Sequence, residues 1–243
     1  MTVCRPSTPR AAALRLGAAL FALAAVIALP HPAHAAGKWR LVTQDEGVRV
    51  YDMPEAGRAV PRFRGVATIE APALHLLAIL GDVARSCEWN TACKHSVLLH
   101  KVDDLRMTFH NRLKAPWPVS DRDAILKTSA LISKDGKTIT ALFRAIAYPS
   151  RPPASGVVRF PKLVGQYAMT VLGPTTTKVV YTIDSDSGGW LPDWVVRYAT
   201  KKVPIGTLAG LRAQATRTRG KYDAFIAKHT AKAPAPAPAP PAK

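Results

Sequence analysis

Cysteines and acidic residues are scarce in this chain. Its 243 residues include three cysteines and 16 aspartates and glutamates, against 34 lysines and arginines, which gives a formal charge of +18. Three cysteines are too few for a disulfide scaffold, so the fold depends on a hydrophobic core, for which a hydrophobic content of 48% is sufficient. The positive charge predicts attraction to nucleic acid or to an anionic lipid surface, and it also fits a general role in solubility.

Catalytic and nucleotide-binding motifs are missing as well. There is no G-x-S-x-G elbow, no H-E-x-x-H pair, no P-loop and no G-x-G-x-x-G turn. No nucleic-acid-binding motif accompanies the positive charge. These absences argue against an enzyme and against nucleic acid as a partner, and we expect neither a cofactor nor a metal ion.

Only one apolar run stands out, and it lies near the start. Arg5, Arg10 and Arg15 form a positive start, the apolar run Leu16–Leu29 comes next, and the small residues Ala33–Ala36 follow it. An apolar run shorter than the ~20 residues of a spanning helix, with a charged start and an A-x-A site, is typical of a cleaved signal peptide. We predict that residues 1–36 are this signal and that the protein is exported, to the periplasm or outside; a retained signal anchor is the alternative.

Export changes the interpretation of the charge. Removing residues 1–36 takes away three arginines and no acidic residue, which leaves a charge of +15. Nucleic acid is not the expected partner in an exported space, so an anionic membrane surface becomes the favoured one.

The far end has a composition of its own. Residues 231–243 are rich in proline and alanine, which alternate from Ala233 onward, a pattern typical of an extended tail that cannot form a packed core. The tail acts either as a spacer or docking arm or as a solvated end. Between the two ends we predict one domain, residues 37–230, in a monomeric protein.

The order of strands and helices in this domain predicts an α+β fold. The stretches "GVRVYDM" and "RFRGVATIE" form an early strand pair, and Pro72 opens the helix "PALHLLAILGDV". Two later hairpins turn at Asp135–Gly136 and at "GPTT", and a long helix ends the domain. Because strands and helices are segregated along the chain, we expect an antiparallel sheet rather than alternating βα units.

The strand "DLRMTFHNRL" alternates clearly. One face carries Leu105, Met107, Phe109, Asn111 and Leu113, and the opposite face is basic and polar. Asn111 is the one polar side chain on a face that should point inward, and a buried amide without partners costs ~1–3 kcal/mol. A ligand hydroxyl or a water is one candidate partner; a satisfied core asparagine or a position near solvent is the alternative.

The final helix begins within "GGWLPDWVVRYATKKVP". Gly188–Gly189 ends the preceding strand, Pro192 suits the first turn, and Pro204 should kink the helix. The side chains of its apolar stripe repeat every three to four residues and include Trp194, Val195, Tyr198 and Leu208. This stripe must lie on something apolar, and the antiparallel sheet is the available partner.

These segments resemble a START domain, the lipid-transfer module of the helix-grip group, here of a bacterial exported type. The resemblance is carried by "DVARSCEWN" (82–90), "PWPVSDRD" (116–123) and "GGWLPDWVVRYATKKVP" (188–204), and their order covers nearly the whole domain. It implies a long curved antiparallel sheet around a kinked C-terminal helix, with a tunnel for one apolar ligand between them. The final helix and the loop 149–165 would form the gate.

The resemblance and the alternation together assign site residues. Those expected to bind the ligand are Met107, Phe109, Asn111, Trp194, Val195, Tyr198 and Leu208. Those expected at the gate are Arg159, Phe160 and Lys162. Arg122 lies between Asp121 and Asp123, where it is interpreted as an ion-pair hub or a clamp at the strand start.

Two further interpretations concern cysteine and tryptophan. Cys87 and Cys93 lie six residues apart near His95, a spacing too irregular for a metal site, so in an exported protein we expect a disulfide, with free thiols as the alternative. Trp117 lies in a turn and is expected to be structural, whereas Trp194 either lines the cavity or fills the core.

We therefore expect an exported protein that binds or transfers one lipid, such as a sterol, phospholipid, fatty acid, carotenoid or quinone. A helix-grip enzyme resembling a polyketide cyclase is the alternative, since such enzymes have scattered residues. A structural envelope-binding protein is a third possibility, which rests only on the charge and the tail.

Overall fold

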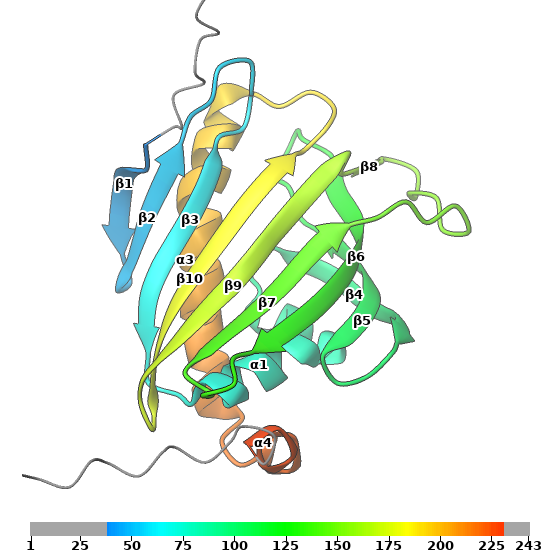
Figure 1. Ribbon diagram of the computed structural model, residues 1–243. Helices are drawn as coiled ribbons and strands as arrows, with labels where there is room; N and C mark the ends of the chain where they lie inside the picture. The colour runs from blue at the N-terminus through cyan, green and yellow to red at the C-terminus, as the bar shows by residue number, and fades with distance from the viewer. Residues whose placement is uncertain (1–37, 231–243) are drawn as a thin grey trace, which may run out of the picture. The chain divides into compact units, whose positions relative to one another are not determined.

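The computed structural model describes residues 38–230 of the chain (Figure 1). The predicted signal peptide and the proline- and alanine-rich tail lie outside these residues. Within 38–230, no helix combines the length and apolar character needed to cross a membrane.

One large sheet dominates the described residues. Its spatial order is β1-β2-β3-β10-β9-β7-β6-β5-β4, every neighbouring pair along this order is antiparallel, and β8 adds a short parallel pairing with β6. The strands are β1 (Arg40–Asp45), β2 (Val48–Met53), β3 (Arg62–Ile69), β4 (Cys93–Lys101), β5 (Arg106–Leu113), β6 (Asp121–Ile132), β7 (Thr138–Ala145), β8 (Val157–Arg159), β9 (Lys162–Gly173) and β10 (Thr176–Asp186).

Helices cover one face of this sheet. The long helix α3 passes behind β3, β10 and β9 in Figure 1 and contacts β1, β2, β3 and β10. The helices are α1 (Ala73–Gly81), α2 (Ser86–Trp89), α3 (Asp193–Arg217) and α4 (Asp223–Thr230), with a 3-10 turn, η1 (Val83–Arg85), before α2. A long antiparallel sheet that holds a C-terminal helix confirms the predicted α+β helix-grip class.

Alternating side chains explain why the central strands bury one face. On β9 and β10, Met169 pairs with Val179 and Tyr167 with Tyr181, and all four side chains are buried. Their sequence neighbours point to the other face, as the period of two requires. Burial of this row and of the apolar side of α3 forms the main core.

Helix α3 lies unusually close to its neighbours at two glycines. A Cβ atom at Gly65 of β3 would lie 3.0 Å from both Leu208 and Pro204, and one at Gly210 of α3 would lie 1.9 Å from the carbonyl oxygen of Trp89. Only glycine lets the backbones approach this closely. The structure assigns one continuous helix on both sides of Pro204, whose ring is buried against the sheet.

The turn before α3 has the predicted character. Gly188 and Gly189 have φ values of 58° and 62°, which residues with a Cβ atom rarely adopt. We expected Pro192 within the first turn of the helix. It is instead the N-cap, the residue just before the first helical residue, Asp193. This turn therefore sets the direction in which the helix returns over the sheet.

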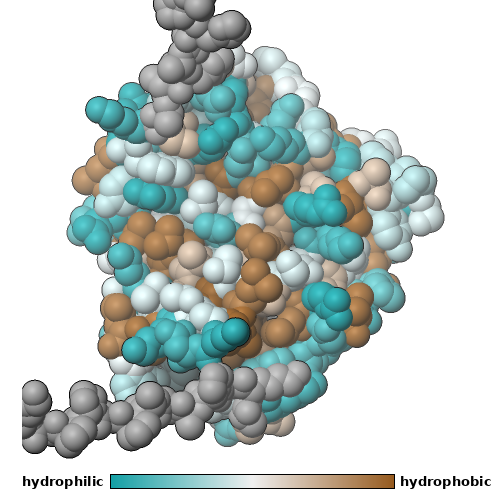
Figure 2. Space-filling model, in the orientation of Figure 1, coloured by the Kyte–Doolittle hydropathy of each residue, from teal (hydrophilic) through white to brown (hydrophobic). Residues whose placement is uncertain are grey.

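The opposite face of the sheet is partly apolar. The face turned to the viewer in Figure 2 shows hydrophobic side chains between hydrophilic ones. Leu131 of β6 and Val164 of β9 are exposed, and each alternates with neighbours that point to the core. Arg64 covers part of the β1–β3 edge, where its guanidinium lies over the rings of Trp39 and Tyr51.

Candidate ligand cavity

A cavity of about 550 Å³ lies between the sheet and α3. Side chains from α1, β5, β6, β7, β9, β10 and α3 line it, and most of them are apolar. Its size falls in the range of roughly 300–1,000 Å³ that small-molecule sites occupy. The cavity therefore has the size and character of a site for one apolar molecule.

Most of the predicted site residues line this cavity. Met107, Phe109 and Asn111 reach it from β5, and Val195 and Tyr198 reach it from α3. That these side chains bind a ligand remains a prediction.

Two predicted ligand contacts lie elsewhere. Leu208 is fully buried but packs at Gly65 of β3 rather than in the cavity wall. Trp194 is exposed on α3 and is not among the lining residues. The apolar stripe of α3 is thus divided between the cavity and the contact with β3.

Asn111 is a polar group in an apolar wall. Its Oδ1 lies 3.7 Å from Sγ of Cys93. A disulfide sulfur carries no hydrogen, so this contact leaves the amide able to bond a ligand group. The arrangement fits the expectation that Asn111 meets a ligand hydroxyl or a water.

Stacked aromatic rings form a wall that the sequence analysis did not single out. The centroids of Tyr167 and Tyr181 lie 4.6 Å apart, and Phe143 packs against both rings. Burial raises the pKa of both tyrosines, so their hydroxyls stay protonated. The alternation that placed Met107 and Phe109 inward also holds on β9 and β10, and it would have identified these tyrosines.

The loop predicted as part of the gate is anchored to the sheet. Residues 149–165 contain β8 and the start of β9, and Phe160 lines the cavity. Arg159, also expected at the gate, is not among the lining residues, and its guanidinium binds both oxygens of Asp123 at 2.7 and 2.9 Å. His110 approaches the same carboxylate at 2.9 Å. Asp123, not Arg122, is the ion-pair hub of this segment.

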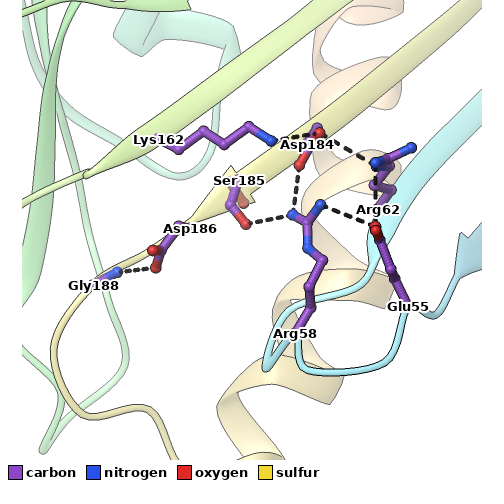
Figure 3. Close-up of polar contacts among 8 residues, drawn as sticks. All are labelled: Glu55, Arg58, Arg62, Lys162, Asp184, Ser185, Asp186 and Gly188. Carbon is purple, nitrogen blue, oxygen red and sulfur yellow. Dashed lines mark hydrogen bonds and ion pairs between the residues drawn. The ribbon is translucent and has the colours of Figure 1, made fainter. Parts of the chain in front are cut away.

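A second charged cluster joins the β2–β3 loop to β10 and to the start of β9 (Figure 3). Asp184 of β10 binds Arg58 and Arg62 from one side and Lys162 from the other, and Glu55 also contacts both arginines. Lys162 is therefore an ion-pair partner rather than a free cation at the gate.

Arg122 does not bridge its two neighbouring carboxylates. Asp121 instead pairs with Lys94 and Arg112. The guanidinium of Arg122 points to backbone carbonyls, and the residue lines the cavity. Of the two interpretations, an ion-pair hub does not hold, because the alternation along β6 sends Arg122 and its two neighbours to opposite faces of the sheet. The contacts with the carbonyls of Ser120, Gly188 and Trp190 fit the other interpretation, a clamp at the start of the strand.

The structure also bears on the expectations for the two cysteines and for Trp117. Cys87 of α2 and Cys93 of β4 form a disulfide, which joins the two elements beside the cavity residue Trp89. Trp117 is 89% exposed, so it is not the structural residue that its position in a turn suggested.

The sheet and α3 together define a helix-grip protein with an internal apolar cavity. The chain belongs to the START domain family, whose model matches residues 28–218. An uncharacterized protein of Pseudomonas aeruginosa is 32% identical over 177 residues, which cover 73% of this chain and 86% of that protein.

Two further relatives have descriptive names. Phosphatidylcholine transfer protein of Rattus norvegicus is 25% identical over 176 residues, covering 71% of this chain and 81% of the rat protein. The crystal structure of a STAR-related lipid transfer protein from Xanthomonas axonopodis matches with a TM-score of 0.65 and 30% identity, covering 73% of this chain and 98% of that one.

Proposed function

We propose that this protein binds one lipid molecule in the cavity and transfers it between membranes in an exported space. The observation that carries the proposal is the apolar cavity between the sheet and α3, built by side chains from both. The names of the rat and Xanthomonas relatives support lipid transfer as the purpose of such a cavity.

The end of the cavity near the start of α3 is suited to meet a membrane. Trp190, Trp194 and Tyr198 are exposed there, and so is Trp117 in the loop before β6. Arg122 joins the two segments, because its guanidinium donates to the carbonyl of Ser120 in that loop and to the carbonyl of Trp190. Tryptophan and tyrosine beside basic side chains favour a water–bilayer boundary. Opening of α3 at this end would let the lipid enter without covalent chemistry.

The alternative, a helix-grip enzyme, makes a different prediction about the bound molecule. A carrier releases the molecule that it took up, whereas a cyclase releases a changed one. Native mass spectrometry of the purified protein, with extraction of the bound molecules, decides between them. A repeatable intact lipid, together with its movement between donor and acceptor vesicles, supports the proposal; absence of any bound or transferable apolar molecule contradicts it.

Export is tested separately. We expect the mature protein to begin near Gly37, because the charged start, the short apolar run and the A-x-A site precede that residue. N-terminal sequencing of the protein from the cell envelope checks this, and an intact Met1 in the membrane fraction would show a retained anchor.

A further inference from the structure

Arg122 is a buried positive charge in the wall of an apolar cavity. The residue is 5% exposed and lines the cavity at the start of β6. Its Nη1 donates to the carbonyl of Ser120 at 2.6 Å, and its Nη2 donates to those of Gly188 and Trp190 at 3.2 and 3.3 Å. Its Nε–H has no hydrogen-bond partner among the described residues.

The charge of Arg122 is not balanced by a carboxylate within residues 38–230. Both neighbouring aspartates have other partners, since Asp121 binds Lys94 and Asp123 binds Arg159. Burial lowers the pKa of Arg122, but an arginine stays protonated at neutral pH. Buried charges are normally paired, because removing an ion from water without a counter-ion is costly.

The nearby wall does not supply the missing negative charge. Lys114 and Pro116 line the cavity from the segment before β6, and Phe160 and Leu191 line it from β8–β9 and from the turn before α3. Among the described residues, the one acidic residue in the lining is Asp104, which precedes β5, whereas Arg122 pairs with Leu113 at the far end of that strand. Eight strand residues separate the two ends by roughly 25 Å, and Lys101 and Lys228 already pair with Asp104.

We propose that the ligand of this cavity is an amphiphile with an anionic oxygen head group, which binds Arg122, and an apolar tail, which extends along the cavity away from the turn before α3. The inference rests on the proposed lipid-binding function and names the ligand class. Carboxylate and phosphate oxygens suit the planar, multiply donating guanidinium. The head group supplies the counter-charge, and the apolar walls provide space for the tail.

Wild-type protein alone tests the head-group preference. The probes are palmitate, hexadecyl phosphate, hexadecanol and methyl palmitate, whose tails are similar and whose head groups differ in charge. Each competes with an environment-sensitive apolar dye below its critical micelle concentration. We expect at least one anionic probe to bind about tenfold or more tightly than the two neutral ones, since a charge-assisted pair is stronger than a neutral hydrogen bond. The ranking of palmitate against hexadecyl phosphate distinguishes a carboxylate from a phosphate ligand.

Matched variants separate Arg122 from the general positive charge. Arg122→Met removes the buried charge, whereas Arg197→Met removes one exposed charge from α3 outside the cavity lining. We expect R122M to lose the preference for the anionic probe and to keep its affinity for hexadecanol, and R122K to retain part of the preference. R197M should behave as wild type. Butyrate, which has the charge without the tail, should not compete.

A second measurement does not depend on any variant. Palmitate labelled with ¹³C at the carboxyl group should titrate, when bound, at a lower pH than in vesicles, because a nearby cation favours its ionised form. An unchanged or higher midpoint, or equal affinity of the anionic and neutral probes, overturns the inference while lipid binding stands. Failure of all four probes to displace the dye would instead contradict the proposed function.

Discussion

Val195 is the residue whose side chain tests most directly whether α3 covers a cavity. It is buried and lines the cavity from α3, whereas Lys201, on the same helix, is exposed and outside the lining. We predict that Val195→Trp fills the space and lowers lipid binding at least several-fold without unfolding the protein. In a solid core the same change would cost ~1–3 kcal/mol of stability.

Thermal unfolding and uptake of a fluorescent lipid check this prediction, with Lys201→Trp as the control. A large drop in the melting temperature of V195W, with unchanged binding by the folded fraction, would show that no cavity exists under this helix.

Asp123 is the second residue with a measurable role. Its carboxylate is 2% exposed, and Arg159, 22% exposed, holds both oxygens. Burial acts to raise the pKa of Asp123, but the hydrogen bonds from Arg159 and His110 outweigh it and hold the pKa below its usual range. We predict that Asp123→Asn costs roughly 2–3 kcal/mol at neutral pH, less than a fully buried pair because Arg159 still contacts water.

The pH dependence of this loss follows from the direction of the shift. A depressed carboxyl pKa stabilises the fold above the unfolded value of about 3.9, and the contribution disappears as the pH falls through the folded value. The difference in unfolding free energy between wild type and D123N should therefore stay constant near neutrality and shrink below about pH 4. Urea unfolding across this range measures it; a difference that persists at low pH argues against the ion pair as its cause.

Among the elements, the contact between α2 and α3 depends on one glycine. A Cβ atom at Gly210 would overlap the carbonyl oxygen of Trp89, whereas one at Gly173 would meet only a side-chain atom of Thr176 at 4.0 Å. We predict that Gly210→Ala lowers stability by more than ~1 kcal/mol, because the two backbones must separate, and that Gly173→Ala has a small effect. Differential scanning calorimetry of both variants decides this; equal melting temperatures would mean that α3 shifts without cost.

The elements also show what the sequence can predict. The alternation on β5, the Asp135–Gly136 turn and the Gly188–Gly189 turn were enough to place the central strands and α3. The strand β4 was not predicted from the sequence. Its register shifts at two places, between Cys93 and His95 and between Leu98 and His100, which breaks the period of two. The strand β1 also has a register shift, β8 has three residues, and α4 is a short helix with little burial.

The site was predictable to the extent that it lies on regular elements. Local periodicity predicts the face of the strand or helix on which Met107, Phe109 and Val195 lie, and all three line the cavity. Periodicity does not predict which other element packs against that face. The same periodicity led us to expect Leu208 at the ligand, but its side chain packs at Gly65 of β3 and is not among the residues that line the cavity. The burial of Arg122 without a carboxylate depends on its contacts with Gly188 and Trp190, which lie 66 and 68 positions later in the chain. The local sequence pattern carries no information on such distant contacts.

For the whole molecule, charge is the property with the broadest consequence. Residues 38–230 contain 29 of the 34 basic residues and all 16 acidic ones, so this part of the chain is strongly positive. Such a charge increases the rate of encounter with an anionic bilayer, and salt screens it with a Debye length of about 10 Å at 0.1 M. Where the positive side chains lie should therefore matter as much as how many there are.

Two double variants that remove the same number of positive charges from different places can show whether the position of the charges matters. Arg197 and Lys201 lie on α3 just after the turn at the end of β10, whereas Lys178 lies at the opposite end of that strand and Lys134 in the β6–β7 turn. We predict that changing Arg197 and Lys201 to glutamine slows lipid transfer between anionic vesicles several-fold, and that the same change at Lys134 and Lys178 slows it little. Both double variants should bind the free lipid as wild type does, because none of the four side chains lines the cavity.

Transfer rates at low and high salt, with anionic and with neutral vesicles, measure the effect. Equal slowing by the two variants would mean that net charge alone governs the encounter, and a rate independent of salt would mean that the membrane is not recognised by its charge.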